Sequence, residues 1–426
     1  MNNIRITFKA LTKSIDFKVE SENNIHDFVN DLFLTFEHTV DHENKLIKLQ
    51  CIQRNSEEIR SRIGVIVEKY KHLNPKVYQI RDYFKELAIE EHFLFFYNLE
   101  LNSEENTEAF MLLHSLEDQV DLDTIKSQIN DVFGDFFKRY ELLSFDGEKK
   151  FRIGESDKSK RVCRFCGKGN GEVTFKNVAH SISEAFGNKN IITNDECDSC
   201  NERFGAGIEH DLIQYLSLYR NFFQVRGKNG VPKLRGKNFE IEPGDRFSIH
   251  HYLSKEQEED PERNPFNVRF ESHESVALQN VYKAMVKYAL SVMPTSELIH
   301  FRDTIEWING ETNVAQLPKV AMLHSYSLLV EHPKITLSIR KSEDQRVPYT
   351  VAEFRFTSLA FVFIIPLSSK DCRSYYNAED FDHFWNSFSH YSQQDGWKFE
   401  NMSDSVRRPF AMNLKFEVRK GAEAVE

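Results

Sequence analysis

CRFC at residues 163–166 and CDSC at residues 197–200 determine the fold of the central part of this 426-residue chain. Thirty residues separate the two Cys-x-x-Cys pairs. Two thiolates spaced in this way on a tight turn can bind the same ion, and two such turns complete a tetrahedron around Zn²⁺. Gly167, directly after the first pair, suits such a turn. The sequence therefore predicts a structural zinc site with the ligands Cys163, Cys166, Cys197 and Cys200.

A site closed by four thiolates has no open coordination position, so these cysteines alone indicate a structural role. The paired spacing also permits redox-active thiols. Six cysteines in 426 residues do not form the pattern of a secreted disulfide scaffold. The N-terminal MNNIRITFKA lacks the basic and apolar segments of a signal peptide, and we expect a cytoplasmic protein.

The segment between the cysteine pairs has the pattern of a strand, a loop, a second strand and a helix. The first strand delivers His180 at its end, and the helix carries Asn201 directly after the last cysteine. A metal bound at both ends would hold His180 against the first turn of this helix. The expected elements are a strand at 172–178, a loop at 181–190, a strand at 191–193 and a helix capped by Asp198.

The stretches CRFCG, AHSISEAFGN and NDECDSCN resemble the HNH endonucleases, whose catalytic core is the ββα-metal or His-Me finger. The resemblance covers about residues 160–230. In that family a strand-end histidine is followed about fourteen residues later by asparagine, and here Asn194 follows His180 at that interval. The resemblance implies that His180 is the general base, that Asn194 orients the loop bearing it, and that Asn201 binds a catalytic Mg²⁺ or Mn²⁺ ion.

Two departures from the family pattern concern the catalytic ion. Ala179 stands where many members have Asp or Glu as a second ligand, and the interval from Asn194 to Asn201 is shorter than the commonest one. Another side chain must then complete the shell of the ion. Glu209 and His210 are the nearest candidates, and Glu209 is favoured because Mg²⁺ prefers carboxylate oxygen. Both residues also fit an ordinary solvated helix face.

Charge is distributed unevenly along the chain, whose formal net charge is −11. Residues 1–146 carry 17 basic and 27 acidic groups, residues 147–238 carry 17 and 11, and residues 239–426 carry 21 and 28. The cysteine pairs thus lie in a positive segment between negative ones, as nucleic-acid binding requires. We expect phosphate contacts from a basic stretch without acidic residues, namely Arg220, Arg226, Lys228, Lys233, Arg235 and Lys237.

The flanking segments have mixed patterns, and the fold class expected for the whole chain is α+β. The N-terminal segment begins with a hairpin, 4–8 paired with 15–19, followed by helices at 26–36, 57–70, 77–88 and 124–143. The C-terminal segment has a helix at 275–293, with Lys283 and Lys287 expected to face water, and an antiparallel meander from 335 to 365. Three domains are expected: 1–146, the central HNH-like zinc finger module 147–238, and 239–426.

The leading hypothesis is a metal-dependent endonuclease that hydrolyses DNA. By analogy with the family, its setting would be bacterial restriction or anti-phage defence, with a protein regulator or operon partner. The longest apolar run of the chain has seven residues, far fewer than the about 20 needed to cross a membrane, so no membrane partner is expected. One rival is a catalytically silent zinc adaptor that binds nucleic acid or protein, and a second is an HNH nuclease acting on RNA or a hybrid. The sequence favours no oligomeric state.

Overall fold

The structure is a computed structural model, and the chain forms a mixed α+β protein with several antiparallel sheets. Two compact units, Met1–Gly134 and Asp135–Glu426, are described separately. The structure describes residues 2–21, 25–41, 46–71, 77–99, 101, 103–244, 247–254 and 267–415.

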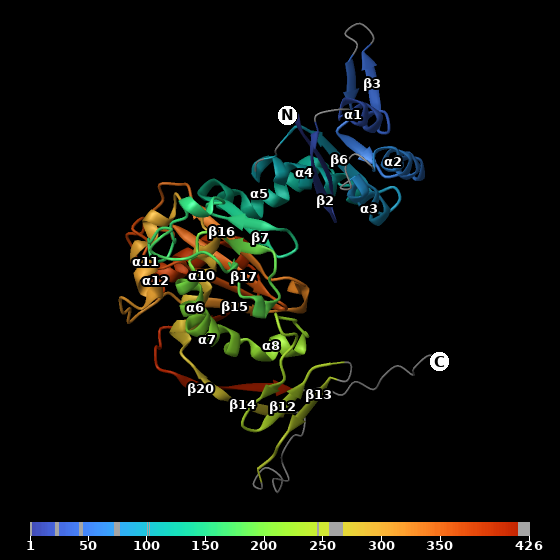
Figure 1. The fold of residues 1–426 in the computed structure, drawn as a ribbon. Helices are drawn as coiled ribbons and strands as arrows, with labels where there is room; N and C mark the ends of the chain where they lie inside the picture. The colour runs from blue at the N-terminus through green and yellow to red at the C-terminus, as the bar shows by residue number, and fades with distance from the viewer. Residues whose placement is uncertain are drawn as a thin grey trace. The chain divides into compact units, whose positions relative to one another are not determined.

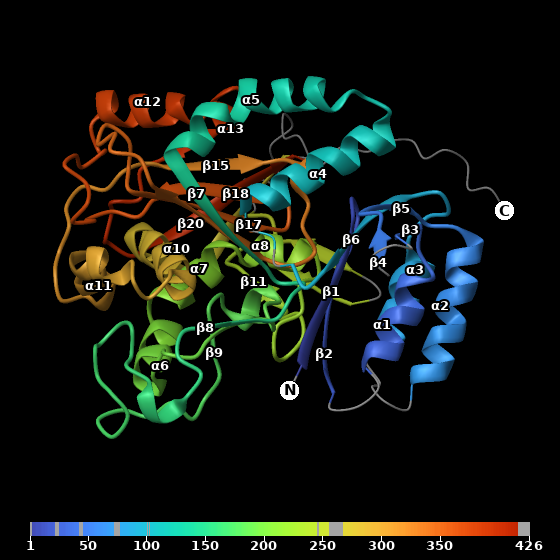
Figure 2. The same ribbon diagram turned by 90° about the horizontal axis from the view of Figure 1, so that it is seen from above.

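The first unit is built on an antiparallel sheet of order β2-β1-β6-β5. The expected hairpin is confirmed, because Ile4 lies opposite Val19 and Phe8 opposite Ile15. Helices α1, α2 and α3 cover one face (Figure 2), and α4 packs on β6 through Leu113. The elements are β1 (Asn2–Ala10), β2 (Ser14–Ser21), α1 (Ile25–Phe33), β3 (His38–Asp41), β4 (Leu46–Leu49), β5 (Ile52–Arg54), α2 (Glu57–Tyr70), α3 (Tyr78–Glu86), β6 (His92–Tyr97) and α4 (Ser103–Asp118).

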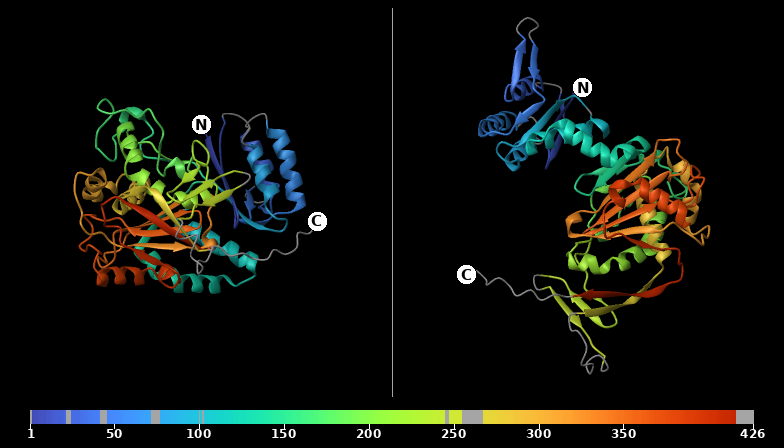
Figure 3. Two further views of the ribbon diagram at one scale, coloured as in Figure 1. Left: turned by 90° about the horizontal axis from the view of Figure 1, so that it is seen from below. Right: turned by 180° about the vertical axis from the view of Figure 1, so that it is seen from behind.

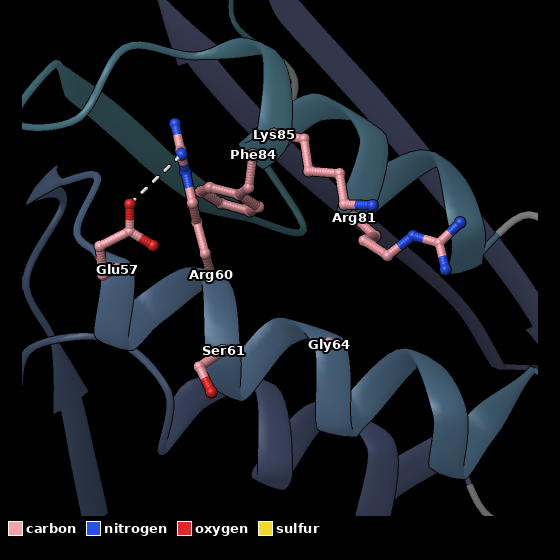
Figure 4. A pocket seen from close by; sticks show the side chains of 7 residues that line it. All are labelled: Glu57, Arg60, Ser61, Gly64, Arg81, Phe84 and Lys85. Carbon is pink, nitrogen blue, oxygen red and sulfur yellow. Dashed lines mark ion pairs between the residues drawn. The ribbon is translucent and has the colours of Figure 1, made fainter.

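A groove of about 350 Å³ lies between α2 and α3 (Figure 4). Gly64 leaves space in it, because a Cβ placed there would meet no atom within 4 Å. The groove contains no histidine or cysteine and therefore offers neither the general base nor the thiolates expected of the site. Its lining consists of Glu57, Arg60, Ser61, Gly64, Arg81, Phe84 and Lys85.

The second unit contains a six-stranded sheet of order β19-β15-β18-β17-β16-β7. The expected meander is confirmed by the antiparallel pairing of β16, β17 and β18, and β18 is buried along its whole length. Helices α12 and α13 lie on one face of the sheet and α10 on the other (Figure 2). The elements are β7 (Tyr140–Asp146), α10 (Leu278–Val292), α11 (Arg302–Asn309), β15 (Val320–His324), β16 (Lys334–Arg340), β17 (Thr350–Phe356), β18 (Leu359–Ile364), α12 (Ala378–Ser387), α13 (Ser389–Ser392) and β19 (Lys398–Glu400).

The helix expected at 124–143 ends earlier than its periodicity predicts. Helix α5 (Leu122–Arg139) stops at Arg139, and the following residues form β7 instead. Strand β7 pairs with β16 over its full length, and the buried Tyr140 hydroxyl donates to the carbonyl of Pro348. Tertiary pairing at the sheet edge therefore outweighs the local helical pattern.

Helix α10 crosses the middle of the second unit and is buried on nearly every side. The expectation that Lys283 and Lys287 face water is wrong, because α10 lies between the sheet and the cysteine segment, residues 163–217. Lys283 packs its ammonium 5.3 Å from the ring centre of Trp307, and Lys287 is completely buried. At 15 residues α10 is short for a membrane span, and no helix in the described ranges is long and apolar enough to cross a membrane.

A buried ion pair attaches the first cysteine turn to the end of α10. Arg164 donates through Nε to Asp195 Oδ1 at 2.8 Å and through Nη2 to Oδ2 at 3.0 Å. Its Nη1 donates to the carbonyls of Leu290 and Ser291, where the helix dipole favours a cation. The cysteine segment and the C-terminal segment also share one hydrophobic core.

Compact units divide the chain after Gly134, and no such division follows residue 238. The three-part division at residues 146 and 238 therefore stays a prediction about functional modules. Within the second unit, a small lobe joins the sheet β11-β12-β13 to the ribbon β14-β20, with Leu218 of α8 in its core (Figures 1 and 3). Its elements are α8 (Ser217–Phe222), β11 (Leu234–Arg235), β12 (Phe239–Glu242), β13 (Ser248–His251), β14 (Asn267–Val276) and β20 (Arg408–Lys415).

Replacing Arg164 by Met should lower the free energy of unfolding of the second unit by about 3–5 kcal/mol, because Asp195 would stay buried without its partner. Urea titration followed by tryptophan fluorescence measures this, since Trp307, Trp385 and Trp397 all lie in that unit. Lys138→Met is the control: it breaks an exposed pair with Asp135, worth about 0–1 kcal/mol. Equal stability of both variants would contradict the anchoring role of Arg164.

Candidate functional site

The four paired cysteines come together as expected. Their sulfur atoms all lie within 4.8 Å of one another, and all four are free thiols. A Zn–S distance of about 2.3 Å in a tetrahedron requires sulfurs about 3.8 Å apart. The sulfurs of Cys166 and Cys197 are 3.8 Å apart, too far for a disulfide and suited to a shared ion. The cluster can therefore hold a metal such as zinc.

The first cysteine turn has the hydrogen bonds of a metal-binding knuckle. The Gly167 amide donates to the Cys163 carbonyl at 2.8 Å, and Gly167 has φ +70°, which favours glycine. The Cys197 amide donates to the Cys163 sulfur at 3.4 Å. Hydrogen bonds from the Cys200 thiol, and then from backbone amides, lower the pKa of Cys163 to about 5 despite its burial. The same interaction raises the pKa of Cys200, and burial raises the pKa of Cys166 to about 11, so in the metal-free cluster Cys163 is the favoured thiolate.

His180 lies in the first of two short antiparallel strands, although this strand is not the one that the sequence predicted. Strands β9 (Ala179–His180) and β10 (Ile191–Thr193) place Ile192 opposite His180, and β8 (Phe151–Ile153) runs parallel to β10. The buried Asn188 fixes the loop between them: its Nδ2 donates to the carbonyls of Ile182 and Ile191, at 2.7 and 3.0 Å. The sequence did not single out Asn188, although a polar residue after a glycine is a common loop signal.

The strand expected at 172–178 is absent from this described segment, and Asp198 is not the N-cap. Cys197 occupies the cap position of α6 (Asp198–Ala206), without a capping hydrogen bond from its side chain. Asp198 instead accepts hydrogen bonds from the amides of Lys176 and Asn177, at 3.0 and 2.8 Å. This local competition for backbone donors holds 174–177 in an irregular path against α6.

The two predicted asparagines lie at the ends of the second cysteine turn. Asn194 is buried, and its backbone N–H donates to the Ile153 carbonyl at 2.8 Å, which connects this residue to β8. Asn201 is half-buried on the first turn of α6, where its backbone N–H donates to the carbonyl of Cys197. The order strand, loop, strand, helix thus extends from Ala179 to Ala206.

The imidazole of His180 is largely buried but still reaches the surface, with 16% of the side chain exposed. Its Nε2 lies 3.6 Å from Glu184 Oε1, and its buried Nδ1 has no hydrogen-bond partner among the described residues. Burial lowers the pKa of His180 below its ordinary value. Glu184 and Glu209 oppose this effect, while Lys287 and Lys228 reinforce it.

A buried charge cluster joins α10 to the segment that carries the histidine. The ammonium of Lys287 lies 2.9 Å from Glu209 Oε1 and 3.0 Å from Glu196 Oε2, and all three side chains are nearly or fully buried. Burial lowers the pKa of Lys287, but the charges of the two glutamates outweigh it and keep the ammonium protonated. Burial raises the pKa of Glu196 to about 7.

The predicted ligands Glu209 and His210 have different surroundings on α7 (Ile208–Tyr215). Glu209 belongs to the buried cluster, whereas His210 is half-buried and forms no ion pair with the described residues of that cluster. Amide oxygen from Asn201 and carboxylate oxygen from Glu209 are the donors that Mg²⁺ or Mn²⁺ prefers.

The predicted basic stretch is only partly available for phosphate. Arg220 is half-buried and donates to the Gly230 carbonyl. Lys233 and Arg235 form ion pairs with Glu240 of β12. Arg226, Lys228 and Lys237 are exposed and have no ion pair within the part of the chain that the structure describes.

Sequence reasoning missed Lys287 and Glu196. Lys287 stands in an apolar helix of the C-terminal segment, and a lysine in such a helix is usually expected to face solvent. Glu196 stood between predicted site residues, but nothing in the sequence indicated that it is buried.

Comparison with protein families finds that residues 163–217 match the model described as HNH endonuclease. The match includes all four clustered cysteines, His180, Asn194, Asn201, Glu209 and His210. Comparisons with curated proteins and with solved structures found no match.

Zinc analysis of the purified protein should find about one ion per chain, and Cys163→Ser or Cys200→Ser should abolish binding and unfold the module. Each serine replaces a thiolate with a much poorer zinc ligand. Cys372→Ser, at an exposed cysteine outside the cluster, is the matched control and should keep its zinc. Full zinc content in both cluster variants would contradict the four-sulfur site.

Proposed function

We propose that this protein is a metal-dependent endonuclease that hydrolyses phosphodiester bonds in DNA, because residues 163–217 match the HNH endonuclease family model. The observation that carries the proposal is that His180 lies at a strand end with part of its side chain exposed, in a segment whose four cysteine sulfurs come together. A lone buried histidine is more often structural, but this one stands in the expected order with both asparagines.

In this proposal His180 removes a proton from the attacking water. Its lowered pKa keeps the imidazole neutral at neutral pH, and a neutral ring nitrogen can accept a proton. The imidazolium formed in this step would be stabilised by the nearby carboxylates of Glu184 and Glu209. Asn194 would hold the loop bearing the histidine through its attachment to β8.

Asn201 and Glu209 would hold the catalytic Mg²⁺ or Mn²⁺ ion, with His210 as the weaker candidate. When bound, such an ion stabilises charge on the phosphate and on the leaving oxygen. The zinc in the cysteine cluster would have no catalytic role, since four thiolates leave no open position.

DNA is the proposed substrate because the exposed cations of this segment can contact phosphates. Lys228 lies close enough to affect the charge of His180, and Arg226 and Lys237 are exposed on the same stretch. Such contacts position a backbone without reading its sequence. Restriction or anti-phage defence in the cytoplasm, with a protein regulator, is the setting that the family analogy suggests, and the four clustered free thiols fit a reducing compartment.

The direct test is cleavage of plasmid DNA by the purified protein with Mg²⁺ or Mn²⁺. His180→Ala should reduce the rate by about 100-fold or more, because the general base is lost, while folding and zinc content persist. His383→Ala, at an exposed histidine on α12, should cleave like the wild type. Equal cleavage by the His180 variant would remove the nuclease mechanism. No cleavage by any variant would favour the silent adaptor, and cleavage of RNA alone would favour the second rival.

The pH profile of cleavage gives an independent test. The general base must be neutral, so activity should fall as pH falls through the pKa of His180. Because burial lowers that pKa, the acid limb should have its midpoint below the ordinary value of about 6.5. A midpoint above that value would show that His180 is not the base or is not buried in solution.

A further inference from the structure

Lys287 lies outside the matched segment 163–217, yet it is the only cation recorded in contact with the two glutamates buried there. It comes from α10, about seventy positions beyond the end of that segment. Neither glutamate has another ion pair within the described part of the chain. A fully buried lysine is rare unless its charge is matched, and here two carboxylates match it.

Helix α10 also touches the histidine-bearing loop at other points. The Ser291 carbonyl accepts a hydrogen bond from the Thr193 hydroxyl at 3.3 Å, and Thr193 lies opposite Ala179 in the strand pair. Tyr288 packs edge-on against Phe186, with ring centres 6.4 Å apart. The helix therefore supports β10 and the loop after His180 as well as Glu209.

The two glutamates differ in their relation to the proposed catalytic ion. Both lie about 3 Å from the same ammonium, but only Glu209 is a proposed ligand of the catalytic ion. Glu196 directly precedes Cys197, before the second cysteine turn, whereas Glu209 follows that turn in the sequence. Removing one or the other carboxylate thus separates a catalytic effect from a purely structural one.

We propose that Lys287 is a positioning residue of the nuclease site, which fixes the carboxylate of Glu209 on α7 through their buried ion pair and makes α10 part of the nuclease centre. The inference rests on the proposed nuclease function. A free glutamate on α7 could rotate toward solvent, whereas an ion pair buried between α7 and α10 fixes its carboxylate. Precise placement matters because a shift of about 1 Å in a supporting group can reduce a rate by about 100-fold.

Glu209→Gln and Glu196→Gln form the matched pair for the test, measured as kcat and KM on DNA with Mg²⁺. Each removes one carboxylate charge, and each leaves Lys287 paired with the other glutamate. Glu209→Gln should lower kcat by about 100-fold with little change in KM, and Glu196→Gln should stay within about threefold of the wild type. Thermal unfolding followed by tryptophan fluorescence should show similar stability for both variants.

Lys287→Met, alone and with Glu209→Gln, tests whether the lysine acts through that glutamate. The loss of kcat caused by Lys287→Met should disappear in the Glu209→Gln background, because there is no carboxylate left to position. If Lys287→Met does not fold, Lys287→Gln, which keeps a polar side chain in the buried site, takes its place in the same comparison. Equal kcat for both glutamate variants would overturn the inference while leaving the nuclease intact. No cleavage by the wild type would instead refute the proposed function itself.

Discussion

Four sulfur atoms within 4.8 Å of one another are the constraint on which this site depends. They join the turn at 163–167 to the start of α6, so that everything between them is closed into a loop tied at both ends. Within that loop only two short strands and one small helix are regular. Segments this short do not hold their shape alone, and a metal can supply the missing stability. The cysteine cluster therefore limits how far the segment bearing His180 can move from the start of α6.

The second source of order is the set of charges buried against α10. Arg164 binds Asp195 and the carbonyls at the end of the helix, while Lys287 binds Glu196 and Glu209. Buried ion pairs add little net stability compared with apolar packing, but breaking one is costly. Such pairs fix a single arrangement, since any shift of α10 along the cysteine segment would leave a charge without its partner. This explains why the two segments form one unit although the cysteine pattern occupies only one of them.

Local patterns were sufficient for much of this structure. The Cys-x-x-Cys spacing predicted the metal cluster, the alternation at the N-terminus predicted the first hairpin, and the apolar run at 359–365 predicted a buried strand. The failures came where tertiary contacts decide. Tyr140 joined a strand rather than a helix because an open sheet edge was available to it. Lys287 was expected in water because helix periodicity cannot show what covers the polar face.

The account requires two separate ion sites in the module, and anomalous diffraction from crystals soaked in Mn²⁺ tests this most directly. Zinc should give one peak at the centre of the four cysteine sulfurs. Manganese should give a second peak, bound by Asn201 or Glu209 and beside the ring of His180. A manganese peak only at the cysteines, or none within reach of His180, would contradict the account of this segment as a hydrolytic centre.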